Sequence, residues 1–124
     1  MGVQLGRCYM LAGTYKITCD QGATFERVIT VKDSTGTPMN LTGFTARMQV
    51  RRETESSEVL VELTTENGRI SLGGTAGTIT LSMDPATTAA IADEGVYDIE
   101  IISNAGAVHR VLKGRFVLDL EVTR

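Results

Sequence analysis

Apolar and polar residues alternate along most of the chain. This period of two is typical of β-strands that place one face on a core and the other in water. The alternation is clearest over residues 44–51, and it recurs over 78–83 and 115–123. Weaker alternation predicts further strands over these ranges: 14–20, 24–32, 59–64, 69–72, 96–103 and 107–113. Spacing typical of a helix is almost absent, so the chain is predicted to be an all-β protein.

Turn-forming residues separate these runs, and one short helix interrupts them. Asp84 can cap a helix over 84–92, Pro85 suits its first position, and Gly95 would end it. About eight short strands separated by turns indicate a β-sandwich. A short helix before the strand at 96–103 resembles the crossover before the sixth strand of immunoglobulin-like domains. The predicted fold is therefore an immunoglobulin-like antiparallel β-sandwich with one short helix near 84–92.

The length of 124 residues fits one domain. Residues 14–124 hold the predicted strands and are expected to form that domain. Residues 1–13 are expected to form an N-terminal arm, in which Leu5, Tyr9 and Leu11 do not follow the alternation. An apolar arm needs a surface on which to lie, so these three side chains are candidate interface residues.

The last strand is predicted to be unusually long. Core-facing positions keep even numbers from 108 to 122, through Gly114, which favours one bent strand with a kink at that glycine. About fifteen residues at ~3.3 Å each would reach about 50 Å, which is more than a sandwich of this size needs. The excess is expected to pair with the first strand, the other sheet or a neighbouring subunit.

Several apolar residues fall on the predicted outward faces of the strands. They include Val28, Ile102, Val111 and Val117. If the last three cluster, they mark a surface for a second copy of the chain or another protein. Exposed aliphatic residues are also common on protein surfaces and then have no such role.

Composition and charge indicate a folded domain and argue against nucleic-acid and membrane partners. Apolar residues make up 42% and charged residues 22% of the chain, as in folded globular domains. The net charge of -3 argues against a nucleic-acid partner, because phosphate backbones require a positive surface. No apolar run approaches the ~20 residues that cross a bilayer, so no membrane partner is expected.

The residues that could perform chemistry are few. His109 is the single histidine, and no nucleophile motif accompanies it. Cys8, Cys19 and His109 together fall short of the about four ligands of a zinc site. We therefore expect no catalytic, metal-binding or cofactor-binding residues and no enzymatic activity. Both cysteines are predicted to be free thiols, because residues 1–13 lack the features of a signal peptide.

An acidic group leaves one metal hypothesis open. Asp93, Glu94 and Asp98 could offer oxygen ligands to calcium. The alternative is a solvated turn followed by an acidic strand face, which we favour. The loop at 73–77 is glycine-rich but lacks the Lys-Ser/Thr ending of a phosphate-binding loop.

Two groups of residues form motifs that go beyond the alternating pattern. The first is a D-x-x-G-x-P-x-x-L-T-G turn between two strands, with Asp33, Gly36, Pro38, Leu41, Thr42 and Gly43 in its positions. The second is a Tyr97-Asp98 strand, a v-x-r-x-x-x-G strand over 108–114 and the ending 121–124, Glu-Val-Thr-Arg. Together these motifs resemble a small domain of tailed-phage and prophage virion proteins, and the resemblance covers about residues 14–124.

This resemblance implies a non-enzymatic structural protein of the virion, assembled in the host cytoplasm. Its partners would be other virion proteins and further copies of itself, and it would act as an adaptor or attachment module in the tail, baseplate or fibre. A capsid decoration protein is one alternative. A β-sandwich that binds a small ligand or carbohydrate is another, and the position on head, neck, tail or baseplate stays open.

Overall fold

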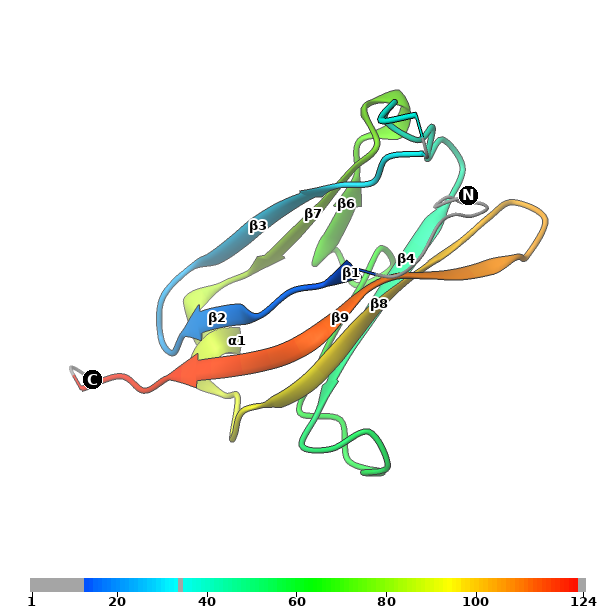
Figure 1. The fold of residues 1–124 in the computed structure, drawn as a ribbon. Coiled ribbons are helices and arrows are strands. Elements are labelled where there is room, and N and C mark those ends of the chain that lie inside the picture. The colour runs from blue at the N-terminus through cyan, green and yellow to red at the C-terminus, as the bar shows by residue number, and fades with distance from the viewer. Residues whose placement is uncertain (1–12, 34, 123–124) are drawn as a thin grey trace.

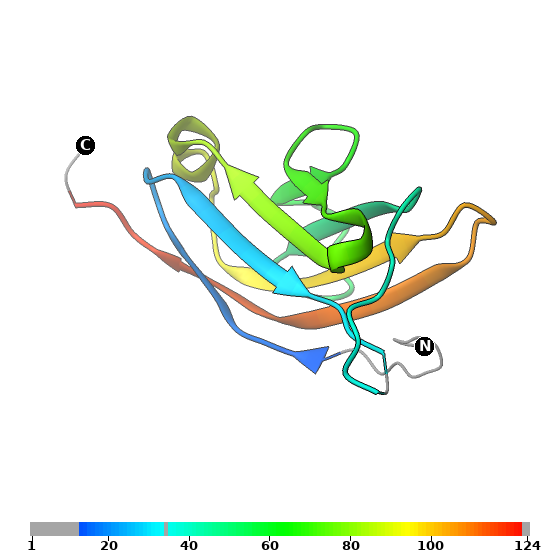
Figure 2. The same ribbon diagram turned by 90° about the horizontal axis from the view of Figure 1, so that it is seen from above.

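A computed structural model describes residues 13–33 and 35–122. Two β-sheets pack face to face, with one short α-helix at one end (Figures 1 and 2). The larger sheet has the order β1-β9-β8-β4-β5, and β2 also pairs with β9; the smaller sheet has the order β3-β7-β6. The predicted β-sandwich with one helix is confirmed at this level.

The strand bounds follow the alternating pattern closely. The larger sheet consists of β1 (Gly13–Thr14), β2 (Ile17–Asp20), β4 (Thr45–Arg51), β5 (Val61–Thr64), β8 (Gly95–Ile102) and β9 (Val108–Asp119). The smaller sheet consists of β3 (Phe25–Thr30), β6 (Ile70–Leu72) and β7 (Thr78–Met83). The helices are α1 (Pro85–Ala89) and the 3₁₀ turn η1 (Gly74–Ala76).

The core lies between the two sheets and is mostly aliphatic. Its fully buried side chains include Met48, Ile79, Leu81, Ile99 and Phe116, which come from both sheets. Each such side chain contributes roughly 1.5–3 kcal/mol when it is removed from water.

Helix α1 begins where the sequence predicts and ends earlier. The Asp84 carboxylate accepts a hydrogen bond from the Thr87 backbone N–H at 2.8 Å, and Pro85 occupies the first turn. The Thr88 side chain is fully buried and donates to the Ala23 carbonyl at 2.8 Å. This bond ties the helix to the connection between β2 and β3.

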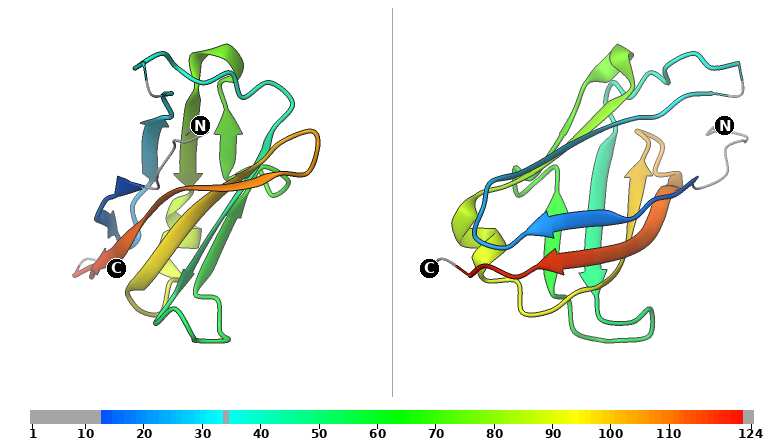
Figure 3. Two further views of the ribbon diagram at one scale, coloured as in Figure 1. Left: turned by 45° about the vertical axis from the view of Figure 1, so that its right-hand side comes forward. Right: turned by 60° about the vertical axis from the view of Figure 1, so that its left-hand side comes forward.

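The expectation of a purely antiparallel sandwich is wrong at one edge. Strands β1 and β2 run parallel to β9, with Gly13 opposite Leu112 and Ile17 opposite Phe116 (Figure 3). Parallel neighbours need a long connection between them, and here nearly the whole chain supplies it. Because β2 leads into β3 of the other sheet, no hairpin forces it to run antiparallel. This pairing also gives the long last strand one of its expected partners.

Strand β9 is continuous through Gly114, as predicted, but its irregularity lies elsewhere. Ile99 is opposite Leu112 and Glu100 is opposite Arg110, so Val111 is an extra residue in a β-bulge. The bulge reverses which positions face inward. Val111 is 7% exposed and belongs to the core, which corrects the expectation that it faces solvent.

The end of β9 also departs from the predicted pattern. Leu120 and Val122, which were expected in the core, are 69% and 91% exposed. The pairing of β2 with β9 stops at Asp20 and Asp119, and the chain beyond leads away from both sheets (Figure 1). Because none of the described strands covers them, the alternating residues here do not become buried.

Gly114 permits a close crossing of two backbone segments. It lies opposite Tyr97 on β8, and a Cβ at this position would overlap the carbonyl oxygen of Tyr15. The Tyr97 hydroxyl donates to that carbonyl at 2.6 Å, and the Tyr15 N–H donates to the Lys113 carbonyl at 2.9 Å. Together these contacts fasten the segment between β1 and β2 to the centre of the larger sheet.

We predict that Tyr97→Phe lowers the free energy of unfolding by about 1 kcal/mol, because it removes one hydrogen bond to a half-buried carbonyl. Gly114→Ala should lower it further, since the backbone of Tyr15 must move. Urea unfolding followed by circular dichroism measures both. Tyr15→Phe is the control, because its exposed side chain makes no described hydrogen bond. Equal stability of Tyr97→Phe and the wild type would contradict this view of the crossing.

We also predict that Val111→Lys lowers the free energy of unfolding by at least about 3 kcal/mol, because it places a charge in the core. Val117→Lys should stay folded. Its chain neighbours Phe116 and Leu118 point into the core, so Val117 points to the outer face of the sheet. Thermal melts of the two variants provide the comparison. If the Val111→Lys protein were as stable as the Val117→Lys protein, the result would contradict the burial of Val111 in the core.

Candidate functional site

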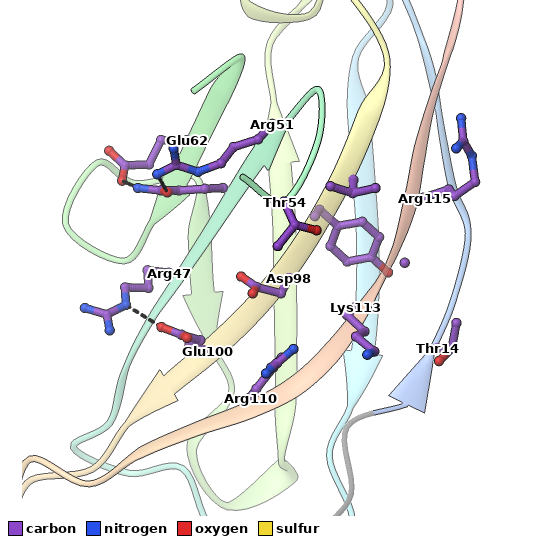
Figure 4. A pocket seen from close by; sticks show the side chains of 14 residues that line it. Thr14, Arg47, Arg51, Thr54, Glu62, Asp98, Glu100, Arg110, Lys113 and Arg115 are labelled. Atoms are coloured by element: carbon purple, nitrogen blue, oxygen red, sulfur yellow. Dashed lines mark hydrogen bonds and ion pairs between the residues drawn. The ribbon is translucent and has the colours of Figure 1, made fainter. Parts of the chain in front are cut away.

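The outer face of the larger sheet is hollowed into an open groove of about 840 Å³ (Figure 4). Side chains of β4, β5, β8 and β9 line most of it, with Thr14 of β1 at its edge. Five positive and three negative side chains face the groove, a local excess of two positive charges on a chain whose net charge is -3. We refer to it as the charged groove.

The charges in this groove form stripes that follow the strands. Their sign alternates from one strand to the next across the sheet. The positive stripes are Arg110, Lys113 and Arg115 on β9 and Arg47 and Arg51 on β4; the negative stripes are Asp98 and Glu100 on β8 and Glu62 on β5. Directly opposed residues of unlike charge stabilise a sheet, so the stripes support the observed strand order.

Hydrogen bonds fix the β4 and β5 side of the groove. Arg47 Nε contacts Glu100 Oε1 at 2.8 Å, and Gln49 Nε2 donates to Glu62 Oε2 at 2.8 Å. Arg51 donates to Gln49 Oε1 at 2.7 Å and to the Ser56 carbonyl at 2.6 Å. Exposed ion pairs contribute at most about 1 kcal/mol each, so their main effect here is to hold side chains in place.

The β9 side of the groove is not neutralised in the same way. Arg110 lies opposite Glu100 and Lys113 lies opposite Asp98 in the strand register. Nevertheless, within residues 13–33 and 35–122, neither cation has a carboxylate within 4.0 Å, and Glu100 is engaged by Arg47 from the other side. Arg115 lies 3.8 Å from Glu94. The β9 stripe therefore carries positive charge that the described part of the chain does not pair.

The predicted interface residues are placed differently from one another. Ile102 and Val117 are half-buried on the outer face, beside the charged groove. Ile102 is opposite Val108 at one end of β9, and Val117 is opposite Thr18 near the other, roughly 30 Å away at ~3.3 Å per residue. With Val111 in the core, the three do not form one cluster. Leu5, Tyr9 and Leu11 lie outside the described residues.

The other candidate groups are dispersed. His109 is half-buried opposite Ile101 on β8. Asp93 contacts Arg52 at 3.3 Å, Glu94 lies near Arg115, and Asp98 faces the charged groove. Across the described ranges, no group of three His, Cys, Asp or Glu residues could hold a metal ion.

Cys19 is a fully buried free thiol on β2. Burial, reinforced by the neighbouring Asp20 carboxylate, raises the pKa of the thiol to about 11, although Arg27 opposes the shift. Such a thiol is protonated at neutral pH and is a poor nucleophile. The second predicted free thiol, Cys8, lies outside the described residues.

Sequence reasoning did not identify the charged groove. The signal was present, because the alternation over residues 44–51 puts Arg47, Gln49 and Arg51 on the same face as one another. The other stripes required the order of the strands in the sheet, and the position of Arg110 required the bulge at Val111. Both depend on contacts between distant segments.

Comparison of the sequence with models of protein families and with curated proteins gave no match. Among the helices in the described ranges, none has the length and apolar character to cross a membrane. The fold, the charged groove and the sequence motifs are therefore the basis for inferring function.

We predict that Cys19 makes the protein less stable as the pH rises from 9 to 11. The folded state keeps the thiol proton above the pH at which an unfolded thiol loses it, so stability is complete below about pH 9 and then falls. Cys19→Ala should flatten this decline. Urea titrations across this range measure the slopes. An identical decline in Cys19→Ala and the wild type would exclude a contribution from Cys19.

Proposed function

We propose that this protein is a non-enzymatic structural module of a tailed-phage virion, acting as an adaptor or attachment module in the tail, baseplate or fibre. The observation that carries the proposal is the place of the motif residues in the fold. Tyr97 and Gly114 form the crossing that fastens the first strands to the larger sheet, and Arg110 lies in the charged groove. The residues that resemble the phage domain are thus those on which this architecture and its open face depend.

The turn motif supports the same proposal. Asp33 accepts a hydrogen bond from the Thr35 hydroxyl at 2.6 Å and bonds from the N–H groups of Thr35 and Thr37 at 2.9 and 3.0 Å. These bonds, the hydroxyl bond first among them, lower the pKa of its carboxyl. Gly36 and Gly43 have φ of 86° and 80°, which glycine adopts without strain. The motif therefore shapes the connection that carries the chain from the smaller sheet to the larger one.

We infer further that the topology is immunoglobulin-like. The order β3-β7-β6 corresponds to strands B, E and D of such domains, and β4-β8-β9 corresponds to C, F and G. In this assignment β1 and β2 take the place of strand A, paired with the last strand instead of the second. Helix α1 then precedes strand F, the position of the crossover before the sixth strand of immunoglobulin-like domains.

The proposed partners are other virion proteins and further copies of this chain, joined in the host cytoplasm and retained in the particle. The outer face of the larger sheet offers both charged and apolar contacts, since Ile102 and Val117 flank the charged groove. Such a mixed surface is suited to a defined protein contact.

Two alternatives make different predictions. A capsid decoration protein would use the same fold on the head and not on the tail. A carbohydrate-binding sandwich would place aromatic rings in its cleft, but the aromatic residue that lines the charged groove among the described residues is Tyr97, which is 4% exposed. The groove therefore favours a protein partner over a sugar.

The proposal is tested on particles of the phage or prophage that encodes the gene. We expect the protein in purified particles by mass spectrometry, and we expect deletion of the gene to yield particles that lack the tail, baseplate or fibre part it attaches. Complementation with the wild-type gene is the control. Complete tails with heat-sensitive heads would instead indicate a decoration protein, and absence from purified particles would refute a virion role.

A further inference from the structure

We propose that the charged groove binds an extended acidic segment of a partner protein, which lies along β9 and is held by Arg110 and Lys113. This inference deepens the proposed function by naming the docking face and the chemistry of the partner. It depends on that function only for the source of the segment. The binding itself is a property of this chain and can be measured without a virion.

The position of the cations along β9 is the first argument. Arg110, Lys113 and Arg115 all face the groove from one strand and together span about 13 Å, since Arg110 and Arg115 lie opposite residues four apart on β8 at ~3.3 Å per residue. Two of them have no carboxylate partner among the described residues, although both lie in the concave part of the face. Carboxylates spaced along an extended peptide would complete these two ion pairs.

The neighbouring stripes determine where the segment lies. Asp98 on β8 would repel a carboxylate placed above it, and Arg47 and Arg51 on β4 already engage other groups. On the other side of β9, Thr14 of β1 is uncharged. An acidic segment is therefore attracted to the line of β9 and the β1 side of it.

Backbone pairing determines how the segment binds. β9 has β8 on one edge, and β1 and β2 occupy the other edge over residues 112–113 and 116–119. Along these paired residues the described strands leave no edge for an added strand, so the segment binds through the side chains of the face. Val108 and Ile102 at one end, and Val117 at the other, give apolar contacts beyond the charges.

A nucleic-acid strand is the competing anionic occupant, and the groove disfavours it. A phosphate backbone carries a charge at every nucleotide. Its charges would meet Asp98, Glu100 and Glu62 within the same groove. A peptide can place neutral residues over the β8 stripe, so the mixed pattern fits a peptide better.

The test measures the fluorescence anisotropy of a fluorescein-labelled peptide of alternating glutamate and serine, (Glu-Ser)4, with the full chain at ~10 mM salt, where screening is weak. We expect Arg110→Gln and Lys113→Gln each to weaken binding about threefold and the double variant about tenfold. Lys32→Gln is the matched control, because it removes the same charge from an exposed position outside the groove. Asp98→Asn should strengthen binding about threefold, since it removes the repelling charge.

Three outcomes would overturn the proposal. The first is that the (Glu-Ser)4 peptide does not bind. The second is that Lys32→Gln weakens binding as much as Lys113→Gln, which would indicate attraction by overall charge. The third is that labelled oligo(dT) binds more tightly than the peptide, with the same dependence on Arg110 and Lys113. The proposed function fails separately, by absence of the protein from particles. Normal incorporation of the Arg110→Gln/Lys113→Gln protein into virions would overturn the docking role while leaving the virion role intact.

Discussion

Strand β9 pairs with β8 on one edge and with β1 and β2 on the other, and the absence of a side chain at Gly114 allows the second pairing. The backbone of Tyr15 passes so close to Gly114 that any Cβ would displace it, and Tyr97 donates a hydrogen bond to the same carbonyl. Without this approach the segment between β1 and β2 could not follow β9, and the larger sheet would lose its parallel edge. Ile17 and Cys19, which that edge carries into the core, would lose their cover as well.

The bulge at Val111 has a consequence for charge as well as for packing. In a regular strand Arg110 and Lys113 would point to opposite faces, because their numbers differ by an odd count. The extra residue turns Arg110 to the outer face and Val111 to the core, so that three cations share one side of β9. Glu100 then lies between Arg47 and Arg110 and contacts Arg47, so that Arg110 has no carboxylate within 4.0 Å among the described residues. The charged groove thus follows from a local irregularity in one strand.

The features that the sequence predicts well are local ones. Alternation alone defines β4 and β7, and a capping aspartate followed by proline defines the start of α1. The bulge cannot be predicted in this way, because Val111 and Leu112 are both apolar. The sequence therefore fits a strand whether the odd or the even positions face the core. Leu120 and Val122 are mispredicted for another reason: they alternate correctly, but β2 ends at Asp20 and none of the described strands lies opposite them. The alternation of apolar and polar residues predicts which residues can be buried. Which of them are buried depends on the strands and sheets that pack against them.

The two outer faces of the sandwich differ in a way that bears on docking. On the smaller sheet the outward strand positions are mainly hydroxyl-bearing, such as Thr30, Thr78 and Thr80, and Glu26 is the charged residue among the outward positions of its strands. Nearly all the charged strand residues instead lie on the larger sheet. A partner that is recognised by charge can therefore distinguish one face from the other. The striped pattern also disfavours binding of a uniformly charged ligand. Each positive stripe on the sheet borders a negative one, so part of such a ligand would be repelled. Selectivity for an acidic segment along β9 follows from the position of its charges more than from their number.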